Sequence, residues 1–313
     1  MIIYKELANI VPKHQNAVLV IGNFDGIHTG HQQLIERARA TANEMNAPLG
    51  LLTFEPHPRE LFRPDDPPFR ITPEPVKMRR LKKCGLDFVT ALTFDWNFAS
   101  QSPEAFIETV LIHGLAPAHI FIGYDFRFGQ MRKGSHVDLT KAGFEVTVVD
   151  EITDDNGNSF SSSAIRSCLR HGHLEDANKM LGWDWEIEGT VFKGDQRGRE
   201  LGYPTANMKL EKTIHPAYGV YASLVQILED GDNSQWYPAA TNIGIRPMFE
   251  VPTGQVEAYL LDFDGDLYDK TLRVRPVQHL RGEAKFDSLD DLIRQMDEDV
   301  GNTVEILKNL HLT

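Results

Sequence analysis

The pattern of the sequence changes near Gly182, and this change constrains the fold more than any other feature. Before it, short apolar runs alternate with stretches of helical periodicity; these runs occupy residues 17–21, 49–54, 88–94, 120–123 and 146–149. After it, the runs are rich in Val, Tyr, Ile and Thr, with Gly, Asp, Asn and Pro between them; they occupy residues 186–192, 220–227, 255–261 and 271–277. The two halves therefore predict two different fold classes.

The first half, residues 1–182, reads as an α/β domain. Helical periodicity occupies residues 31–45 and 73–84, and a further helix begins where Ser102 can cap it and Pro103 takes the first helical position. Strands that alternate with helices predict a parallel, Rossmann-like sheet covered on both faces. Ligands of such sheets bind beyond the carboxyl ends of the strands.

The second half, residues 183–313, reads as a small antiparallel barrel or sandwich. It ends in a helix that Ser288 caps, with Asp290 and Asp291 in the first turn. One face of this helix is apolar and consists of Leu289, Leu292, Ile293 and Met296. We therefore expect a β-barrel domain followed by a C-terminal helix.

Composition narrows the class of protein. The 313 residues suit two domains, and the net charge of −13 argues against a nucleic-acid binder, although a local positive site can still bind phosphate. Residues 1–182 carry a net charge of −3 and residues 183–313 one of −10. Two cysteines, Cys84 and Cys168, cannot form a disulfide framework. With no signal peptide in the first 14 residues and no apolar run near 18 residues, we expect a cytoplasmic protein without a membrane partner.

The strongest local feature is a glycine-rich turn between an expected strand and an expected helix. Gly22 and Gly26 permit close approach of the backbone, and the helix start offers free N–H groups to phosphate. His28 and His31 are three residues apart, so they share one face and can donate to phosphate oxygens. Two alternatives stay open: zinc ligation, although no third ligand is grouped with them, and a purely structural turn.

Two further segments support a nucleotide site. Ser161, Ser162 and Ser163 precede a helical run with Arg166 one turn in, which fits a phosphate clamp or ordinary helix capping. Residues 123–134 follow a strand and interleave aromatic with basic side chains. That composition suits a flat heterocycle bearing a phosphate, or else a structural loop with core aromatics.

The second half contains its own polar constellation. Residues 194–207 hold several glycines and two arginines and end in Pro-Thr-Ala-Asn, where the Thr205 hydroxyl and the Asn207 amide oxygen are of the kind that Mg²⁺ prefers. Glu257 is the acidic residue of an apolar strand and could accept a proton from an attacking hydroxyl. The alternatives are a glycine-rich hairpin and a solvent-facing strand residue.

Taken together, the chain resembles the bifunctional riboflavin kinase/FAD synthetase family of bacteria. The first half is similar to its HxGH-type nucleotidyltransferase module at residues 21–31, 53–59, 123–129 and 161–166. The second half is similar to its riboflavin kinase module at residues 198–207, 219–221, 242–247, 266–268 and 280–286. Ser163, Met248 and Asp269 depart from the usual Thr, Thr and Gly of the family.

The resemblance implies a Rossmann-like adenylyltransferase domain followed by a six-stranded Greek-key barrel with a C-terminal helix. It implies phosphorylation of riboflavin to FMN and adenylylation of FMN to FAD, with Mg²⁺ and ATP as the other participants. In the first module it assigns ATP binding to Gly22, Phe24, Asp25, His28, His31, Ser161, Ser162 and Arg166, with His28, His31 and Arg166 catalytic. Flavin contacts there are expected from Pro58, Phe62, Asp125, Phe126 and Phe128.

In the second module the resemblance assigns ATP binding to Gly194, Arg199, Thr205 and Asn207, Mg²⁺ binding to Thr205 and Asn207, and flavin binding to Arg281 and Glu283. Glu257 is the expected catalytic base. Two other hypotheses compete: an enzyme with a single live module, and a flavin-binding regulator or carrier. The presence of His28, His31 and Arg166 counts against the first. The presence of Thr205 and Glu257 counts against the second.

Overall fold

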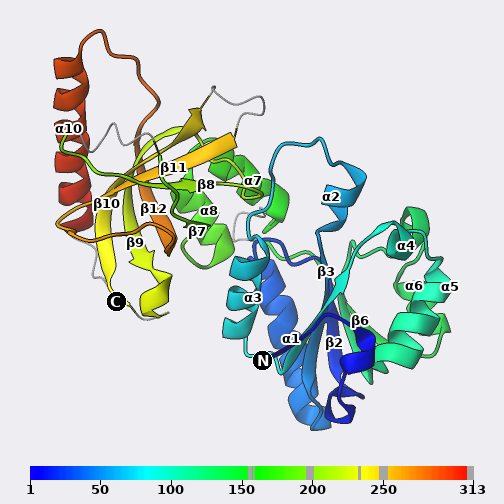
Figure 1. The fold of residues 1–313 in the computed structure, drawn as a ribbon. Coiled ribbons are helices and arrows are strands. Elements are labelled where there is room, and N and C mark those ends of the chain that lie inside the picture. Colours follow the sequence, from blue (N-terminus) through cyan, green and yellow to red (C-terminus); the bar gives the residue numbers. More distant parts are fainter. Residues whose placement is uncertain (154–156, 158, 195–200, 232–233, 247–252, 309–313) are drawn as a thin grey trace. The chain divides into compact units, whose positions relative to one another are not determined.

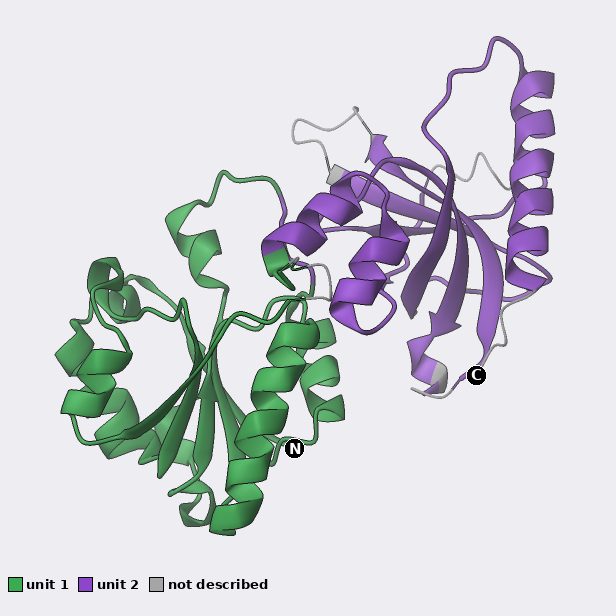
Figure 2. Cartoon of the chain, turned by 180° about the vertical axis from the view of Figure 1, so that it is seen from behind, with its two compact units in different colours: residues 1–67, 72–162 green, residues 68–71, 163–313 purple. Residues whose placement is uncertain are grey.

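The computed structural model describes residues 1–153, 157, 159–194, 201–231, 234–246 and 253–308 (Figure 1). The chain forms two compact units (Figure 2). Unit 1 comprises residues 1–67 and 72–162, and unit 2 comprises residues 68–71 and 163–313. The compact units change over after Ser162, whereas the sequence pattern changes after Gly182, because the intervening helices group with unit 2. The domain limits 1–182 and 183–313 remain a prediction.

Unit 1 is built on a parallel sheet with the strand order β1-β4-β3-β2-β5-β6. Its strands are β1 (Ile2–Tyr4), β2 (Val18–Ile21), β3 (Leu49–Glu55), β4 (Phe88–Thr93), β5 (His119–Gly123) and β6 (Glu145–Val149). The central strands are buried on both faces, which is why they appear in the sequence as continuous apolar runs. The expected Rossmann-like sheet is confirmed.

Helices cover both faces of this sheet (Figure 1). One core joins Val18 and Val20 to α1 (Thr29–Met45), and the other joins Leu19 and Ile21 to α5 (Pro103–Phe106) and the π-helical segment η3 (Ile107–Leu115). The Ser102 hydroxyl accepts the Ala105 N–H at 3.1 Å, so it caps α5 as expected. The remaining helical segments of this unit are η1 (Leu7–Asn9), η2 (Pro12–His14), α2 (Pro58–Phe62), α3 (Glu74–Lys83), α4 (Trp96–Ala99), η4 (Gln130–Arg132) and α6 (His136–Lys141).

Unit 2 is built on an antiparallel sheet with the strand order β7-β12-β9-β10-β11-β8. Its strands are β7 (Ile187–Thr190), β8 (Ala206–Lys209), β9 (Gly219–Ile227), β10 (Trp236–Arg246), β11 (Thr253–Leu260) and β12 (Thr271–Arg281). Because β12 returns to lie beside β9 after the β9-β10-β11 meander, the connection is a Greek key. A bridge between Phe192 and Asn207 joins the two ends of the sheet, so it is a nearly closed barrel.

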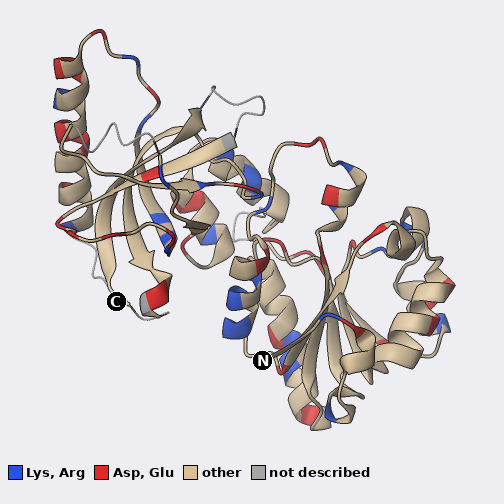
Figure 3. Ribbon diagram, in the orientation of Figure 1, with Lys and Arg blue, Asp and Glu red and all other residues tan. Residues whose placement is uncertain are grey.

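The long C-terminal helix α10 (Leu289–Lys308) packs along this barrel (Figure 1). Leu307 contacts Ala222 and Leu224 of β9, and the Ser288 hydroxyl accepts the Asp291 N–H at 3.1 Å as the expected N-cap. Unit 2 also contains α7 (Ser162–Arg170), apart from its first residue, with α8 (Leu174–Leu181) and η5 (Leu228–Asp230). Lys and Arg gather on α3, whereas Asp and Glu are frequent along α10 (Figure 3).

Candidate active sites

The first candidate site lies where β2 ends and α1 begins. Phe24, Gly26 and Ile27 have φ angles of +52°, +89° and +41°. Left-handed backbone at three of four successive positions folds the chain into a tight loop, and only glycine adopts it without steric cost. A Cβ on Gly22 would lie 2.9 Å from the Phe24 ring, so this glycine makes room for that side chain.

The two histidines meet at the start of α1. The His28 and His31 rings stack with their centroids 3.7 Å apart, and Gly30 is needed because a Cβ there would lie 3.1 Å from the His28 ring. Burial, then the neighbouring His28 and then Lys77 hold the pKa of His31 well below its usual 6.5. The buried Nδ1 of His31 has no hydrogen-bond partner within the described part of the chain. The His31 imidazole is therefore neutral at pH 7 and keeps hydrogen-bonding capacity for a ligand.

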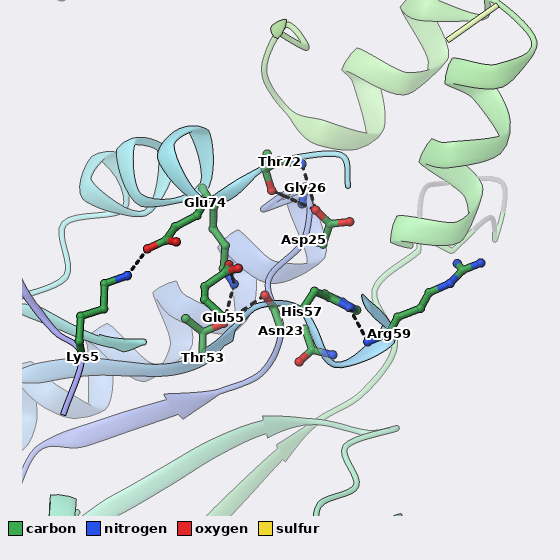
Figure 4. A network of polar contacts seen from close by, with 11 residues as sticks. Lys5, Asn23, Asp25, Gly26, Thr53, Glu55, His57, Arg59, Thr72 and Glu74 are labelled. Atoms are coloured by element: carbon green, nitrogen blue, oxygen red, sulfur yellow. Dashed lines mark hydrogen bonds and ion pairs between the residues drawn. The ribbon is translucent and has the colours of Figure 1, made fainter. Parts of the chain in front are cut away.

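The loop is held from outside by Thr72. The Asp25 carboxylate, only 2% exposed, accepts the Thr72 N–H at 3.0 Å and its hydroxyl at 3.2 Å. The Thr72 hydroxyl in turn accepts the Gly26 N–H at 2.8 Å (Figure 4). The sequence predicts Asp25 as an ATP contact, and the structure shows its carboxylate bound to Thr72. No sequence signal pointed to Thr72, because 47 residues separate it from Asp25.

The serine-arginine motif is divided between the two units. The Ser162 hydroxyl donates to the Asp25 carbonyl at 2.8 Å, which brings this serine to the glycine-rich loop. Ser161 is half-buried just before it. Arg166 belongs to unit 2, where its Nε donates to the Phe69 carbonyl at 2.9 Å and its guanidinium lies over the Phe69 ring.

A buried polar chain connects the end of β3 to the same loop. Lys77 of α3 donates to the Thr53 hydroxyl at 2.7 Å and to the Glu55 carboxylate at 3.0 Å. The Thr53 hydroxyl donates to the Asn23 carbonyl at 3.2 Å (Figure 4). Thr53 and Glu55 belong to a motif that the sequence singles out, but neither they nor Lys77 were predicted as site residues.

The predicted flavin residues of unit 1 differ in exposure. Phe62, in the helix that Pro58 begins, is 54% exposed and makes edge contacts with Phe94 and Trp96 at centroid distances of 5.8 and 5.6 Å. Phe62 therefore presents an aromatic surface that a flat ring could bind.

The other predicted flavin residues follow β5. Phe128 is 7% exposed and packs against Phe106 in the core, and Phe126 stacks beside it at 5.8 Å. Asp125 is exposed. Phe128 is part of the core of unit 1, and flavin contacts by Phe128, Phe126 and Asp125 remain predictions.

The second candidate site is a row of residues across unit 2. In the register of the sheet, Asn207 of β8 lies opposite Glu257 of β11, Glu257 opposite Asn242 of β10, Asn242 opposite Val220 of β9, and Val220 opposite Arg281 of β12. Opposite residues of antiparallel strands project to one face with their Cβ atoms about 5 Å apart. The row thus aligns the predicted base, a predicted Mg²⁺ ligand and a predicted flavin residue.

This row lies on the face that α10 covers, because Val220 alternates in phase with Ala222 and Leu224, which pack against that helix. Arg281 donates hydrogen bonds to the Asp299 carboxylate of α10 from Nε at 3.0 Å and from Nη2 at 2.7 Å. Gly244 makes room for Glu283, since a Cβ there would lie 2.2 Å from the Glu283 carboxylate. Arg281 is therefore held to α10, and Glu283 lies beside Gly244 of β10.

The predicted metal ligands are neighbours. Asn207 Nδ2 donates to the Thr205 carbonyl at 3.0 Å and lies 3.5 Å from its hydroxyl, which leaves the amide oxygen on the opposite edge of the group. Gly194 packs against this amide, where a Cβ would come within 2.9 Å of Asn207 Cγ. Arg199, predicted to bind ATP, lies outside the described residues.

A tyrosine connects this loop to the last helix. The Tyr203 hydroxyl donates to the Asp297 carboxylate of α10, and this bond raises the pKa of Tyr203 to about 12. The Tyr203 ring meets Tyr259 edge-on at 5.2 Å, two residues beyond Glu257 on the same face of β11. Within the described residues, no group of three or more His, Cys, Asp or Glu side chains could hold a metal ion.

Comparisons with known proteins agree with this division. The family model of FAD synthetase matches residues 10–164, and that of riboflavin kinase matches residues 181–307. The bifunctional riboflavin kinase/FMN adenylyltransferase of Escherichia coli K12 is 38% identical over 289 residues, with 91% of each chain covered. Its Bacillus subtilis counterpart is 34% identical over 313 residues, with 96% of each chain covered.

A crystal structure described as a macrolide-efflux protein from Streptococcus pneumoniae superposes with a TM-score of 0.84 at 32% identity and covers 99% of both chains. Over the residues that the structure describes, no helix has the length and apolarity to span a membrane. Two family models in the expected order and relatives aligned over nearly their full length lead to one conclusion. The chain belongs to the bifunctional riboflavin kinase/FMN adenylyltransferase family.

Proposed function

We propose that this chain carries out two consecutive ATP-dependent steps of flavin cofactor synthesis at two separate sites. The row across unit 2 phosphorylates riboflavin to FMN, and the glycine-rich loop of unit 1 adenylylates FMN to FAD. The observation that carries the proposal is the register that sets Glu257 between Asn207 and Asn242 and continues to Arg281. Acid-base, cation-binding and flavin-binding side chains thereby share one face of the barrel.

In the kinase step, Glu257 accepts the proton of the ribityl 5′-hydroxyl as that oxygen attacks the γ-phosphorus of ATP. The bond from the γ-phosphorus to the bridging oxygen breaks, and FMN and ADP are the products. Arg281, held by Asp299, and Glu283 position the flavin. Because Glu257 is half-buried on a strand, its carboxylate is presented by rigid backbone.

The donor set of unit 2 suits Mg²⁺. Thr205 offers a hydroxyl and Asn207 an amide oxygen, and Mg²⁺ in such enzymes takes few protein ligands because substrate phosphates and water complete its shell. Thr205 and Asn207 would hold the ion. When bound, it would neutralise charge on the phosphates of ATP. Gly194 packs on Asn207, and a side chain there would displace this amide.

In the adenylylation step, a phosphate oxygen of FMN attacks the α-phosphorus of a second ATP, and pyrophosphate leaves. A phosphate monoester is already nucleophilic at neutral pH, so the chain has no need to supply a strong base. The stacked His28 and His31 donate hydrogen bonds to the phosphates, and the start of α1 adds the positive end of its helix dipole. The predicted phosphate contacts of Ser161, Ser162 and Arg166 are part of this proposal.

The cytoplasmic location expected from the sequence is also part of the proposal. It is supported by Cys84 and Cys168, which form no disulfide.

The test uses purified protein with riboflavin, ATP and MgCl₂, followed by chromatography of the flavins. FMN should appear first and FAD later, and EDTA should stop both. In the His28→Ala variant, FMN should accumulate without FAD. FMN without FAD from the unaltered chain would contradict the two-step function and favour a single live module. If neither product formed, a flavin-binding regulator or carrier would be the better description.

A further inference from the structure

Lys77 is a buried cation that the proposed chemistry does not use. It lies in α3, where Arg79 and Arg80 are half-buried and Lys82 is exposed, yet its own side chain is 0% exposed. Lysine is almost never fully buried unless it is paired. Its burial at the edge of the nucleotide loop therefore needs an explanation beyond the basic character of the helix.

The partners of Lys77 sit at the carboxyl end of β3. Its ammonium lies 3.0 Å from Glu55, whose side chain is 8% exposed, and 2.7 Å from the Thr53 hydroxyl. Thr53 then donates to the Asn23 carbonyl in the loop before the two histidines (Figure 4). The positive charge of Lys77 also reaches His31 and helps to lower its pKa. The Lys77 ammonium thus binds Thr53, which holds the loop at Asn23, and its charge also acts on His31.

The charges explain why such an amine is needed. ATP and FMN both bring phosphate charge to the loop, and Glu55 places a buried carboxylate at the adjacent strand end. Repulsion between like charges is strong in surroundings from which water is excluded. With Lys77 present, the pair is neutral, and the phosphates meet no net negative charge from this strand end.

We propose that Lys77 is a positioning residue for adenylyl transfer, which cancels the charge of Glu55 beside the triphosphate and holds Thr53 against the nucleotide loop. This inference rests on the proposed function of the unit 1 loop. Lys77 acts through Glu55, through Thr53 and through its charge on His31, so its removal should change the affinity for ATP more than the turnover of bound ATP.

The test is a set of steady-state measurements of FAD formation from supplied FMN. Lys77→Met should raise KM for ATP by about 100-fold with a smaller change in kcat, because breaking a buried pair leaves an uncompensated charge. Glu55→Gln should leave KM for ATP within about threefold, because the charge that remains attracts phosphate. The double variant Lys77→Met/Glu55→Gln should recover KM to within about tenfold of the unaltered chain.

Three controls separate the explanations. Lys5→Met removes an exposed ion pair to Glu74 of the same helix and should change nothing, because solvent screens that pair. FMN formation by unit 2 should be equal in all variants. His28→Ala tests the proposed site itself. If His28→Ala leaves FAD formation intact, the proposed function of the loop fails. If His28→Ala abolishes it while folded Lys77→Met is unaffected, only the role of Lys77 fails.

A purely structural pair gives a different pattern. In that case both single variants would lose activity equally, through kcat and thermal stability, and the double variant would not recover. If Lys77→Met does not fold, the double variant decides the matter. A folded double variant with KM near that of the unaltered chain supports the proposal, and a KM raised by about 100-fold or more overturns it.

Discussion

Replacing Thr72 with valine removes one hydroxyl and leaves the shape of the side chain almost unchanged. That hydroxyl, on a residue 0% exposed, accepts the Gly26 N–H at 2.8 Å and donates to Asp25 at 3.2 Å. In the valine variant, the Gly26 N–H stays buried without this acceptor. The backbone N–H of Thr72 still reaches Asp25, so the loop is loosened at one point and not released.

The magnitude follows from these two bonds. A buried donor left without its acceptor costs about 1–3 kcal/mol, and the longer bond to the carboxylate adds about 1 kcal/mol. We therefore expect the free energy of unfolding of unit 1 to fall by about 3 kcal/mol. If the same loss of about 3 kcal/mol weakens the binding of ATP by the loop, kcat/KM for ATP in FAD formation should fall by about 100-fold. Each tenfold change corresponds to about 1.4 kcal/mol.

The matched control is Thr72→Ser, which keeps the hydroxyl and loses a methyl group worth about 1 kcal/mol of burial. FAD formation from supplied FMN, measured against ATP concentration, should fall steeply for valine and less than about tenfold for serine. FMN formation should not change in either. Equal losses in the two variants would refute the reasoning, because they would show that packing of the methyl group, and not the hydroxyl, supports the loop.

Three further predictions concern stability and the flavin residues. The pKa of folded His31 is depressed, so below about pH 6.5 the unfolded chain binds more protons than the folded chain. The thermal midpoint of unit 1 should therefore be constant above that pH and fall as the pH drops towards about 5, and it should fall less steeply in His31→Asn. A flat profile in the unaltered chain would contradict this. Arg281→Lys loses the forked contact with Asp299 and should raise KM for riboflavin by about tenfold, with FAD formation from FMN as the unchanged control. Asp269 has a φ of +61°, which glycine adopts easily and a β-branched residue does not. Asp269→Gly should therefore shift the denaturant-derived stability of unit 2 by less than about 1 kcal/mol, and Asp269→Val should lower it by about 2 kcal/mol. Equal stability of the two variants would show that this backbone angle carries no strain.

The strands predicted with the closest limits include three with near-uniform burial. β2, β3 and β4 are buried on both faces, so each forms an apolar run whose limits the structure reproduces to within a residue or two. β1 was missed because it is a three-residue edge strand with two exposed isoleucines. β10 was missed because Pro238, Asn242 and Gly244 interrupt its apolar pattern.

The site residues that could be predicted carry a local signal. The spacing of His28 and His31 indicated a shared face, and the rings stack. Glu257 and Asn207 were proposed separately, and only the register of β11 and β8 shows that they are opposite each other. Residue spacing alone contains no such information, because strand pairing is set by the whole sheet.

The residues that support the site could not be predicted from the sequence for a related reason. Thr72 and Lys77 act across 46 and 24 residues of sequence, and neither lies in a motif that suggests a contact. A threonine before a proline indicates a turn, and a lysine on a basic helix indicates solvent exposure. Only the structure shows that both are fully buried, Thr72 on the loop and Lys77 on the strand end that contacts it.

The most direct measurement of the central claim, two chemistries at two sites, uses the Glu257→Ala variant. With riboflavin and ATP, this variant should form no FMN, because the base between Asn207 and Asn242 is gone. With supplied FMN and ATP, it should form FAD at the rate of the unaltered chain, because the histidine pair is untouched. Loss of both reactions together in a folded variant would contradict the assignment of two independent sites.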